Sequence, residues 1–427
     1  MQKVLIITYY WPPAGGPGVQ RWLKFIKYLP EFDFSPIVYI PENPDYPIID
    51  KELLNEVPDD LHILKRPIKE PYAWAALLSK KKTKTISSGI ISDKSISWTE
   101  KVLLWIRGNL FIPDARKLWV KPSTSFLSRF IEKEAIKTII TTGPPHSVHL
   151  IGLRLKQRHA IEWIADFRDP WTSIGYHKKL RLTPSSRRKH EHLEKAVLDK
   201  SDKLIVTSIT TKAEFEKLTD TPIKTITNGF DDGPSTKELD SKFTISHIGS
   251  LLTGRNPESL WQALQELVAD DELFARELRI QLIGVVGEEA LTALKKHKLM
   301  EFVDILGYVP HEEVLELQQK SQILLLLEID SEETRGIVPG KLFEYFKAER
   351  PILGIGPKDW EAGQMITATN SGEVFAHGSK EAIKTVLLDW FKRYQNNNLV
   401  YSPEHIKGFH RRVLTESLAN YIRWELS

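Results

Sequence analysis

The sequence predicts an α/β protein with two doubly wound domains, each a parallel sheet covered by helices on both faces. Two observations support this prediction. Short apolar segments of the kind that form buried parallel strands alternate with amphipathic helical stretches, and the alternation restarts near residue 240 after a polar, turn-rich segment. The chain also has 427 residues, which is more than one ordinary hydrophobic core accommodates.

The first half begins with the apolar run Val4–Ile7, which we expect to be a buried strand. Residues 18–29 place Trp22, Leu23 and Ile26 on or near one face, which predicts a helix. Further strands are predicted at residues 36–40, 138–142, 161–166 and 203–207. We expect this domain to span residues 1–232.

The second half repeats the pattern after the linker candidate at residues 231–235. Strands are predicted at residues 243–248, 279–284, 303–307, 323–327 and 351–353, with helices between them. We expect this domain to span residues 240–400. The amphipathic stretch 403–427 predicts a helix that packs back on the first domain.

The composition of the chain excludes several classes of function. Charged residues make up 27% of the chain and the formal net charge is +3, a balance that does not indicate a nucleic-acid partner. The absence of cysteine excludes disulfides, thiolate zinc sites and cysteine nucleophiles. The start of the chain does not resemble a signal peptide, and no segment approaches the ~20 apolar residues of a membrane span. We therefore expect a soluble, cytoplasmic protein.

Tryptophan is unusually frequent in a lysine-rich stretch at residues 70–120, where Trp74, Trp98, Trp105 and Trp119 lie. Tryptophan together with lysine suits a membrane–water interface. Aromatic core residues beside solvated charges explain the composition equally well. The stretch therefore leaves open a peripheral contact with the inner face of the membrane.

The segment Gly336–Gly356 carries the most specific signal. Pro339 and Gly340 form a flexible turn before a helix that starts at Lys341. The amino terminus of such a helix offers backbone N–H groups and a positive dipole to an anion such as a phosphate. Glu344, one turn into the helix, is placed to accept the hydroxyls of a ribose. An ordinary loop, helix and strand is the alternative.

Two loops of the first half follow predicted strands, at the sheet edge where ligands of open α/β sheets bind. Gly15, Gly16 and Gly18 follow the first strand and allow a ligand close to the backbone, although their spacing is not a dinucleotide fingerprint. His146 begins a helix after the strand at 138–142. There it is placed either to bond a substrate hydroxyl or to cap and pack.

Asp166 and Asp169 flank Arg168 at the end of a hydrophobic strand and among large aromatic residues. Because these surroundings do not fit a solvated surface, we expect a functional cluster in which Arg168 orients a carboxylate or binds an anion. Asn228 and Gly229, between the two halves, indicate a turn.

The second half has loops that match those of the first. Gly249 follows its first strand and leaves room for a phosphate, and Arg255 supplies a cation before the next helix. Tyr308 and Val309 follow a later strand, where backbone groups are placed to pair with the edge of a nucleobase. Because Gly249 mirrors Gly16, we expect a nucleotide diphosphate between the two loops.

Taken in order, these features resemble family 4 of the retaining glycosyltransferases, the group 1 type. Its GT-B fold has two Rossmann-like doubly wound domains that face an interdomain cleft. The resemblance rests on the Gly-Gly loop, Asn-Gly at the hinge, Gly-Ser…Arg, Gly-Tyr-Val-Pro, and Lys-Leu-Phe-Glu-Tyr before Pro-Ile-Leu. It implies transfer of a sugar, with retained anomeric configuration, from a nucleotide-diphosphate sugar to a saccharide or lipid-linked acceptor in cell-surface polysaccharide or glycolipid synthesis. The amino-terminal domain would bind the acceptor and the carboxyl-terminal domain the donor.

By position, the resemblance assigns most of the singled-out residues to donor binding and the others to the catalytic centre. His146 would lie near the transferred sugar, and Asp166 and Asp169 would face the acceptor pocket. Glu344 would bind the ribose, and Arg255 takes the place of the family's phosphate-binding lysine. The donor-binding set is Gly15, Gly16, Gly249, Ser250, Arg255, Tyr308, Val309, Gly340, Lys341, Leu342 and Glu344.

The sequence departs from the family at two positions. Ser250 stands where the family usually has an arginine, and Gly336 where it usually has a glutamate, although Glu332 and Glu333 are close enough in sequence to substitute. The chain contains no Asp-x-Asp motif for Mg²⁺ or Mn²⁺. We therefore expect no metal and no cofactor other than the nucleotide-sugar co-substrate. Cationic side chains and helix termini would neutralise the leaving diphosphate.

Two other functions remain open from the sequence. Epimerases that act on nucleotide-sugars share this fold, and Asp166, Asp169 and His146 keep that chemistry available. A scaffold protein that kept the fold and lost catalysis would also accommodate Ser250 and Gly336. Neither the sugar, the base nor the acceptor is specified by the residues.

Overall fold

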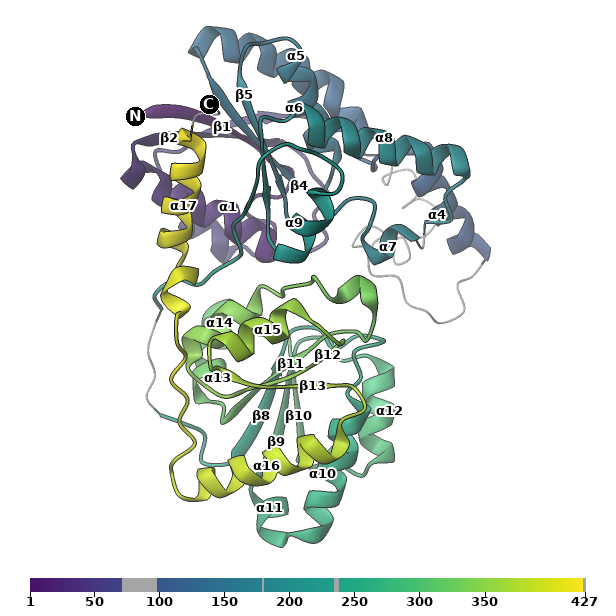
Figure 1. Ribbon diagram of the computed structural model, residues 1–427, viewed down its shortest axis with the longest axis vertical. Coiled ribbons are helices and arrows are strands. Elements are labelled where there is room, and N and C mark those ends of the chain that lie inside the picture. The colour runs from purple at the N-terminus through teal and green to yellow at the C-terminus, as the bar shows by residue number, and fades with distance from the viewer. Residues whose placement is uncertain (71–97, 179, 234–237, 425–427) are drawn as a thin grey trace. The chain divides into compact units, whose positions relative to one another are not determined.

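The structure is a computed structural model that describes residues 1–70, 98–178, 180–233 and 238–424. The chain divides into two compact units. Unit 1 comprises Met1–Asn228 and Arg411–Ser427, and unit 2 comprises Gly229–His410. Each unit is built on one parallel sheet with helices on both faces (Figure 1), so the predicted α/β class with two doubly wound, Rossmann-like domains is confirmed.

Unit 1 has a seven-stranded sheet with the order β3-β2-β1-β4-β5-β6-β7, and every pairing is parallel. Its strands are β1 (Gln2–Ile7), β2 (Phe34–Pro41), β3 (His62–Arg66), β4 (Thr138–Gly143), β5 (Glu162–Phe167), β6 (Lys203–Val206) and β7 (Ile223–Thr225). Its helices are α1 (Pro17–Tyr28), α4 (Trp98–Leu110), α5 (Lys117–Glu134), α6 (Ser147–Lys156), α7 (Gly175–Lys178), α8 (Pro184–Lys200), α9 (Ile209–Phe215) and α17 (Arg411–Arg423), with 3₁₀ turns η1 (Leu29–Phe32) and η2 (Glu52–Glu56).

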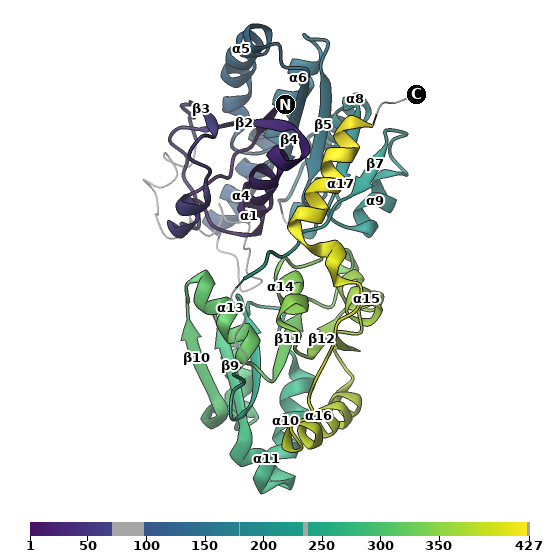
Figure 2. The ribbon, with the colours of Figure 1, turned by 90° about the vertical axis from the view of Figure 1, so that its left-hand side faces the viewer.

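Helix α17 belongs to unit 1 although it follows unit 2 in the sequence. It lies beside α1 (Figures 1 and 2), and its Leu418 and Ile422 join the hydrophobic core of unit 1. The buried Lys203 at the start of β6 fixes its end, because the Nζ atom donates a 3.0 Å hydrogen bond to the carbonyl oxygen of Ile422. The end of the chain therefore completes the first core.

Unit 2 has a six-stranded parallel sheet with the order β10-β9-β8-β11-β12-β13. Its strands are β8 (Phe243–Ile248), β9 (Leu278–Ile283), β10 (Val303–Gly307), β11 (Ile323–Leu327), β12 (Ile352–Gly356) and β13 (Gly372–Ala376). Its helices are α10 (Glu258–Asp270), α11 (Glu272–Glu277), α12 (Glu288–Lys296), α13 (His311–Lys320), α14 (Lys341–Ala348), α15 (Glu361–Ala368) and α16 (Lys380–Gln395), with 3₁₀ turns η3 (Met300–Phe302), η4 (Glu332–Thr334) and η5 (Ile406–Phe409).

Strand β11 shows why an unbroken apolar run forms a central strand. Its Ile323, Leu325 and Leu327 join the core under α10 and α16, whereas Leu324 and Leu326 join the core under α14 and α15. Figure 1 shows these helix pairs on opposite faces of the sheet. Because successive side chains of a strand point to opposite faces, both sets must be apolar.

Three strands were not predicted from the sequence, namely β3, β7 and β13. Each lies at the edge of its sheet and carries exposed or half-buried side chains along its length. An edge strand has solvent on one side and needs no apolar run, which removes the signal that identified the central strands. No helix in the described ranges is long and apolar enough to cross a bilayer.

Candidate functional site

In unit 2, the loop after β8 and the start of α14 bring Gly249 and Lys341 together at the carboxyl edge of the sheet. Gly249 has a φ of 105°, and a Cβ atom added there would lie 3.5 Å from the Nζ atom of Lys341. Gly284 after β9 has a φ of 118°, and its added Cβ would lie 2.8 Å from the backbone of Gly249. Side chains other than hydrogen are disfavoured at both positions, so the glycines keep the backbone close to the lysine.

Lys341 is an enclosed amine with a single hydrogen-bond partner in the described residues. Its Nζ atom donates to the carbonyl oxygen of Ile248 at 2.7 Å. Burial and the charge of Arg255 lower the pKa of Lys341 to about 7, and the charge of Glu328 opposes them. An anion that binds here would meet an amine that gains a proton readily at neutral pH.

Arg255 forms a two-pronged ion pair with Glu328, which follows β11 and is fully buried. The Oε1 atom of Glu328 accepts from Nε at 3.2 Å and from Nη2 at 3.0 Å, and Oε2 accepts from Nη2 at 3.3 Å. The N–H of Ile329 donates to the same Oε1 at 2.9 Å. The sequence left open whether Glu332 or Glu333 supplies a carboxylate near the missing family glutamate. Glu332 is exposed, and Glu333 accepts from a serine of its own turn.

Glu344 lies in the first turn of α14 with its carboxylate turned towards α13. Its Oε2 atom accepts a 3.0 Å hydrogen bond from Nε2 of Gln318, and its Oε1 atom lies 3.7 Å from Nε2 of His311. The side chain is 14% exposed. An ionised carboxylate has about four lone-pair positions, so Glu344 retains capacity to accept hydroxyl groups.

The start of α14 differs from the expected anion-binding helix terminus. The side chain of Leu342 is fully buried in the core, and its N–H already donates to the carbonyl oxygen of Pro339 at 3.0 Å. The N–H of Phe343 donates to the oxygen of Gly340 at 3.3 Å. Because these bonds occupy part of the terminus, an anion here would depend mainly on the Lys341 side chain.

Tyr308 and Val309 follow β10 as expected, but the two side chains lie in different environments. Gly307 before them has a φ of 69°, which turns the chain out of the strand. The side chain of Tyr308 is 74% exposed, and Val309 packs against the core under α14. Ser250, in the loop after β8, is exposed.

In unit 1, Gly15 and Gly16 lie just before α1 and contact a second loop. The N–H of Gly15 donates to the oxygen of Ile48 at 3.1 Å, and the N–H of Asp50 donates back to the oxygen of Pro13 at 2.7 Å. A Cβ on Gly15 would lie 3.0 Å from Ile48, so this position admits only glycine without a shift. Gly16 has a φ of 109° and open space where a Cβ would stand.

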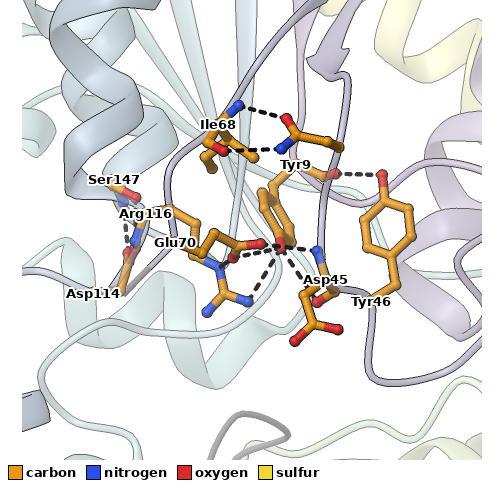
Figure 3. Close-up of polar contacts among 9 residues, drawn as sticks. Tyr9, Asp45, Tyr46, Ile68, Glu70, Asp114, Arg116 and Ser147 are labelled. Atoms are coloured by element: carbon orange, nitrogen blue, oxygen red, sulfur yellow. Dashed lines mark hydrogen bonds and ion pairs between the residues drawn. The ribbon is translucent and has the colours of Figure 1, made fainter. Parts of the chain in front are cut away.

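The second loop is held by a buried polar cluster that the sequence did not indicate (Figure 3). The Nε atom of Arg116 lies 2.9 Å from Glu70, whose other oxygen accepts from the N–H of Asp45. The hydroxyl of Tyr9 donates to Glu70 at 2.8 Å, and the hydroxyl of Tyr46 donates to the oxygen of Tyr9 at 3.0 Å. Burial raises the pKa of Tyr9 well above its usual value, so the phenol stays protonated. The cluster fixes the loop against which the Gly15–Gly16 turn packs.

His146 precedes α6 and is buried against the face of Trp171. The two ring centroids are 4.9 Å apart and the planes differ by 3°. Neither ring nitrogen has a hydrogen-bond partner in the described part of the chain. Burial, followed by the charge of His149, lowers the pKa of His146 well below its usual value. The α6 terminus itself is capped by Asp114, which accepts from the N–H and hydroxyl of Ser147 (Figure 3).

Asp166 does not reach the surface. Its side chain is fully buried and accepts from Nη2 of Arg21 at 3.0 Å, Nε1 of Trp22 at 2.7 Å and the hydroxyl of Thr142 at 2.8 Å. Burial alone would raise the pKa of Asp166, but the charge of Arg21 and these bonds outweigh it and lower the pKa. Arg21 also donates to the oxygen of Thr227 at 2.7 Å. Asp166 therefore connects α1, β4 and β5, and through Arg21 it also connects the segment at Thr227. This buried environment does not match the acceptor-facing position that was expected for Asp166.

Asp169 lies three residues beyond Asp166 in an exposed position. Arg168 between them donates to the backbone oxygens of Gly143 and Pro144 rather than to a carboxylate. Its guanidinium occupies the space beside Gly18, where an added Cβ would lie 2.3 Å from Nη1. The expected role of Arg168 in orienting a carboxylate is therefore not what the geometry shows.

No group of three or more histidine, cysteine or acidic side chains that would hold a metal ion occurs among the residues that the structure describes. The buried ionic contacts that sequence reasoning missed are those of Glu328, Arg21 and the Glu70–Arg116 pair. Glu328 carried the clearest signal, since a charged residue directly follows the fully apolar run Ile323–Leu327.

No protein-family model matches the chain, and no curated protein matches it in sequence. Solved structures match it over almost its whole length. The sucrose-phosphate synthase from Thermosynechococcus elongatus has 12% sequence identity and a TM-score of 0.61, with 99% of this chain and 98% of that chain covered. The lipopolysaccharide outer core galactosyltransferase WaaB in its apo form has 13% identity and a TM-score of 0.58, with 99% of both chains covered.

A third match is a Listeria monocytogenes protein described as a candidate UDP-N-acetylglucosamine 2-epimerase. It has 11% identity and a TM-score of 0.56, with 99% of this chain and 95% of that chain covered. At these identities the likeness bears on the fold, and the chain has the GT-B fold of two Rossmann-like domains.

Proposed function

We propose that this protein is a retaining glycosyltransferase of the family 4 type. It takes a nucleotide-diphosphate sugar as donor and a saccharide or lipid-linked molecule as acceptor. The observation that carries the proposal is the pairing of two cations, Lys341 and Arg255, beside the open backbone of Gly249, with the Glu344 carboxylate on the same helix as Lys341. The GT-B neighbours, which include a galactosyltransferase, support it.

The chemistry follows from the charge that develops when the diphosphate leaves. Lys341 and Arg255 neutralise that charge, and cations held in an enclosed site act more strongly than in water. We propose that no metal is required. We assign no nucleophile among the described residues, so in this proposal the acceptor attacks the face from which the diphosphate departs, and a phosphate oxygen takes the acceptor proton.

Unit 1 supplies the acceptor side of the reaction. His146 is neutral because of its burial, and its ring nitrogens have no hydrogen-bond partner in the described residues, so they would bond a sugar hydroxyl only once the ring becomes accessible. Asp169 is exposed and available to an acceptor, whereas the buried Asp166 positions α1 and β5. We therefore assign binding to His146 and Asp169 and a positioning role to Asp166.

Calorimetric titration with UDP and GDP tests the donor site, after a thermal-shift screen of nucleotide-sugars, because a ligand that binds the folded state raises its stability. Glu344→Gln should raise the dissociation constant at least about tenfold through the loss of a charged acceptor. Glu349→Gln is the matched control, since Glu349 is exposed at the other end of α14. Equal effects of the two variants would contradict the assignment of Glu344.

The epimerase function is the second candidate, because a structural neighbour is described as one. An assay with nucleotide-sugar and no acceptor separates the two. Appearance of an epimeric sugar would favour the epimerase, whereas sugar transfer on addition of an acceptor, with retained anomeric configuration by NMR and full activity in EDTA, would favour the transferase. A chain that binds nucleotide and catalyses neither reaction would be a scaffold.

We further propose a membrane contact in unit 1, through α4 and the start of α8. Helix α4 packs on the segment before α8, since Leu104 contacts Leu180 and the N–H of Thr183 donates to Asn109 at 2.8 Å. Part of the tryptophan-rich stretch, residues 71–97 with Trp74, lies outside the described residues. Trp119 belongs to the core, where it stacks on an aromatic ring of β2.

The remaining tryptophans of the stretch suit a membrane surface. Trp98 is 77% exposed and Trp105 is 42% exposed, one heptad apart on α4. Arg187, Arg188 and Lys189 are exposed on α8. Exposed tryptophans on α4 and exposed cations on α8 together favour anionic headgroups.

Vesicle sedimentation tests this contact with phosphatidylglycerol-containing and pure phosphatidylcholine vesicles. The protein should bind the anionic vesicles, and Trp98→Ala with Trp105→Ala should weaken binding at least about tenfold. Trp424→Ala, at an exposed tryptophan of unit 1 outside α4, is the control. Binding that is unchanged in the double variant would remove α4 from the contact.

A further inference from the structure

We propose that Glu328 is a positioning residue of the donor site, whose buried carboxylate orients Arg255 and keeps Lys341 cationic, so that both are ready for a diphosphate. The proposal rests on the proposed function, because it takes Lys341 and Arg255 as the diphosphate contacts. It assigns a role to a carboxylate that has no place in the transfer step itself.

The geometry of the ion pair leaves one edge of Arg255 available. Glu328 engages the Nε and Nη2 atoms, and no hydrogen bond in the described chain engages Nη1. A guanidinium has five N–H donors in a fixed plane. Arg255, with a side chain 31% exposed, is therefore able to hold Glu328 and a phosphate at the same time.

Glu328 cannot serve the ligand directly, because its side chain has no exposed surface. Its main chain is fixed on both sides. The N–H of Glu328 donates to the oxygen of Ile355 at 3.0 Å, and the carbonyl oxygen lies 2.7 Å from Nε2 of His377. Because its backbone is held, the Glu328 carboxylate stays at the end of β11, where it orients the Arg255 guanidinium.

The charges that face Lys341 come from two residues only among the described groups near it. His247 on β8 is neutral, because burial lowers its pKa well below the usual value, and the buried phenol of Tyr345 is neutral because burial raises its pKa. Arg255 repels the Lys341 ammonium and Glu328 attracts it. Glu328 is thus the one negative charge that offsets Arg255, and its removal would favour loss of the lysine proton.

This arrangement predicts a proton-linked donor site. Lys341 has a pKa of about 7, and a bound diphosphate would raise that value because it places negative charge beside the amine. The affinity for UDP should therefore fall, by up to about tenfold per pH unit, as the pH rises above the midpoint for Lys341.

The experiment is a calorimetric titration with UDP, or with GDP if UDP does not bind, between about pH 6 and about pH 9. Glu328→Gln should move the midpoint of the affinity profile down by about one pH unit, because the offsetting charge is lost. Glu328→Asp, which keeps the charge, should leave the midpoint in place. Glu266→Gln is the matched control, because Glu266 pairs with lysines on α16 rather than with Lys341.

Two further variants test whether the protonation of Lys341 causes the pH dependence of UDP binding. Lys341→Arg should bind UDP with no midpoint in this range, since arginine stays charged. Arg255→Gln should move the midpoint up, since it removes the repelling cation at a partly exposed position. Titration of the nucleotide's own phosphate is common to all variants and cancels in the comparison.

The outcomes separate the two proposals. If neither UDP nor GDP binds the wild-type protein, the donor site is wrong and the role of Glu328 falls with it. If the wild type binds but Glu328→Gln and Arg255→Gln leave the midpoint unchanged, the donor site stands and the positioning role of Glu328 is overturned. Opposite shifts of the two midpoints would establish it.

Discussion

Replacement of Asp166 by asparagine tests whether this carboxylate positions elements of unit 1 or takes part in chemistry. The side chains of Asp166 and Arg21 are 0% and 1% exposed, so neither group is solvated. The change leaves the shape of residue 166 almost intact. It removes the negative charge and presents an amide NH₂ to donors from Trp22 and Thr142.

The magnitude follows from the burial of the pair. Loss of one partner of a buried ion pair costs about 3–5 kcal/mol, because the other charge remains buried without compensation. The two donors that lose their acceptor lie at 2.7 and 2.8 Å, which are ordinary hydrogen-bond lengths, and Arg21 at 3.0 Å keeps only a neutral amide oxygen. We therefore expect Asp166→Asn to lower the free energy of unfolding of unit 1 by about 4 kcal/mol.

Hydrogen-exchange mass spectrometry along a urea series resolves the two units, which a single unfolding curve would not. Peptides from β5 should lose protection at lower urea in Asp166→Asn, and peptides from β11 should not change. Asp169→Asn, at the exposed neighbouring carboxylate, should stay within about 0.5 kcal/mol of the wild type. A stable Asp166→Asn protein that had lost sugar transfer would refute the positioning role and make Asp166 catalytic.

Three other predictions concern unit 1. Burial lowers the pKa of His149 to about 3 and that of His177 to about 4. Below about pH 6.5 the unfolded chain therefore binds more protons than the folded chain. Each histidine should lower the free energy of unfolding by about 2 kcal/mol at pH 5, as measured by urea denaturation. Replacement of His177 by phenylalanine should make the pH dependence shallower, and an unchanged slope would contradict this. Gly18→Ala should displace Arg168 and destabilise α1 by about 1–3 kcal/mol, seen as a lower urea midpoint, whereas a neutral effect would show that the guanidinium moves freely. Glu70→Gln should destabilise unit 1 by about 3–5 kcal/mol and speed exchange in residues 43–50, and slow exchange there would contradict its anchoring role.

The central strands and the order of the loops were predictable from the sequence because they depend on local pattern. A strand that is buried on both faces must be apolar at every position, as β11 is. The apolar run Ile323–Leu327 was therefore recognisable as a central strand. The same reasoning placed Lys341 at the start of α14 and His146 just before α6. Edge strands such as β3 lack this constraint and were missed.

The partners of the charged residues were not predictable in the same way. Asp166 and Arg21 are far apart in sequence, and only the tertiary fold brings α1 and β5 together. A pattern of Asp-Phe-Arg-Asp suggests that Arg168 serves its neighbours, but β5 ends at Phe167 and Arg168 beyond it donates to the backbone oxygens of Gly143 and Pro144. Glu328 and Arg255 meet for a similar reason, since β8 and β11 are adjacent in the sheet but distant in the chain.

A crystal structure of the protein with bound UDP, or with GDP if UDP does not bind, is the most direct test of the central claim. The account predicts phosphate oxygens within hydrogen-bond distance, about 2.7–3.2 Å, of Nζ of Lys341 and Nη1 of Arg255. The Glu344 carboxylate should bond the ribose, and Glu328 should remain paired with Arg255. A nucleotide bound elsewhere, or phosphates that do not contact Lys341 and Arg255, would contradict it.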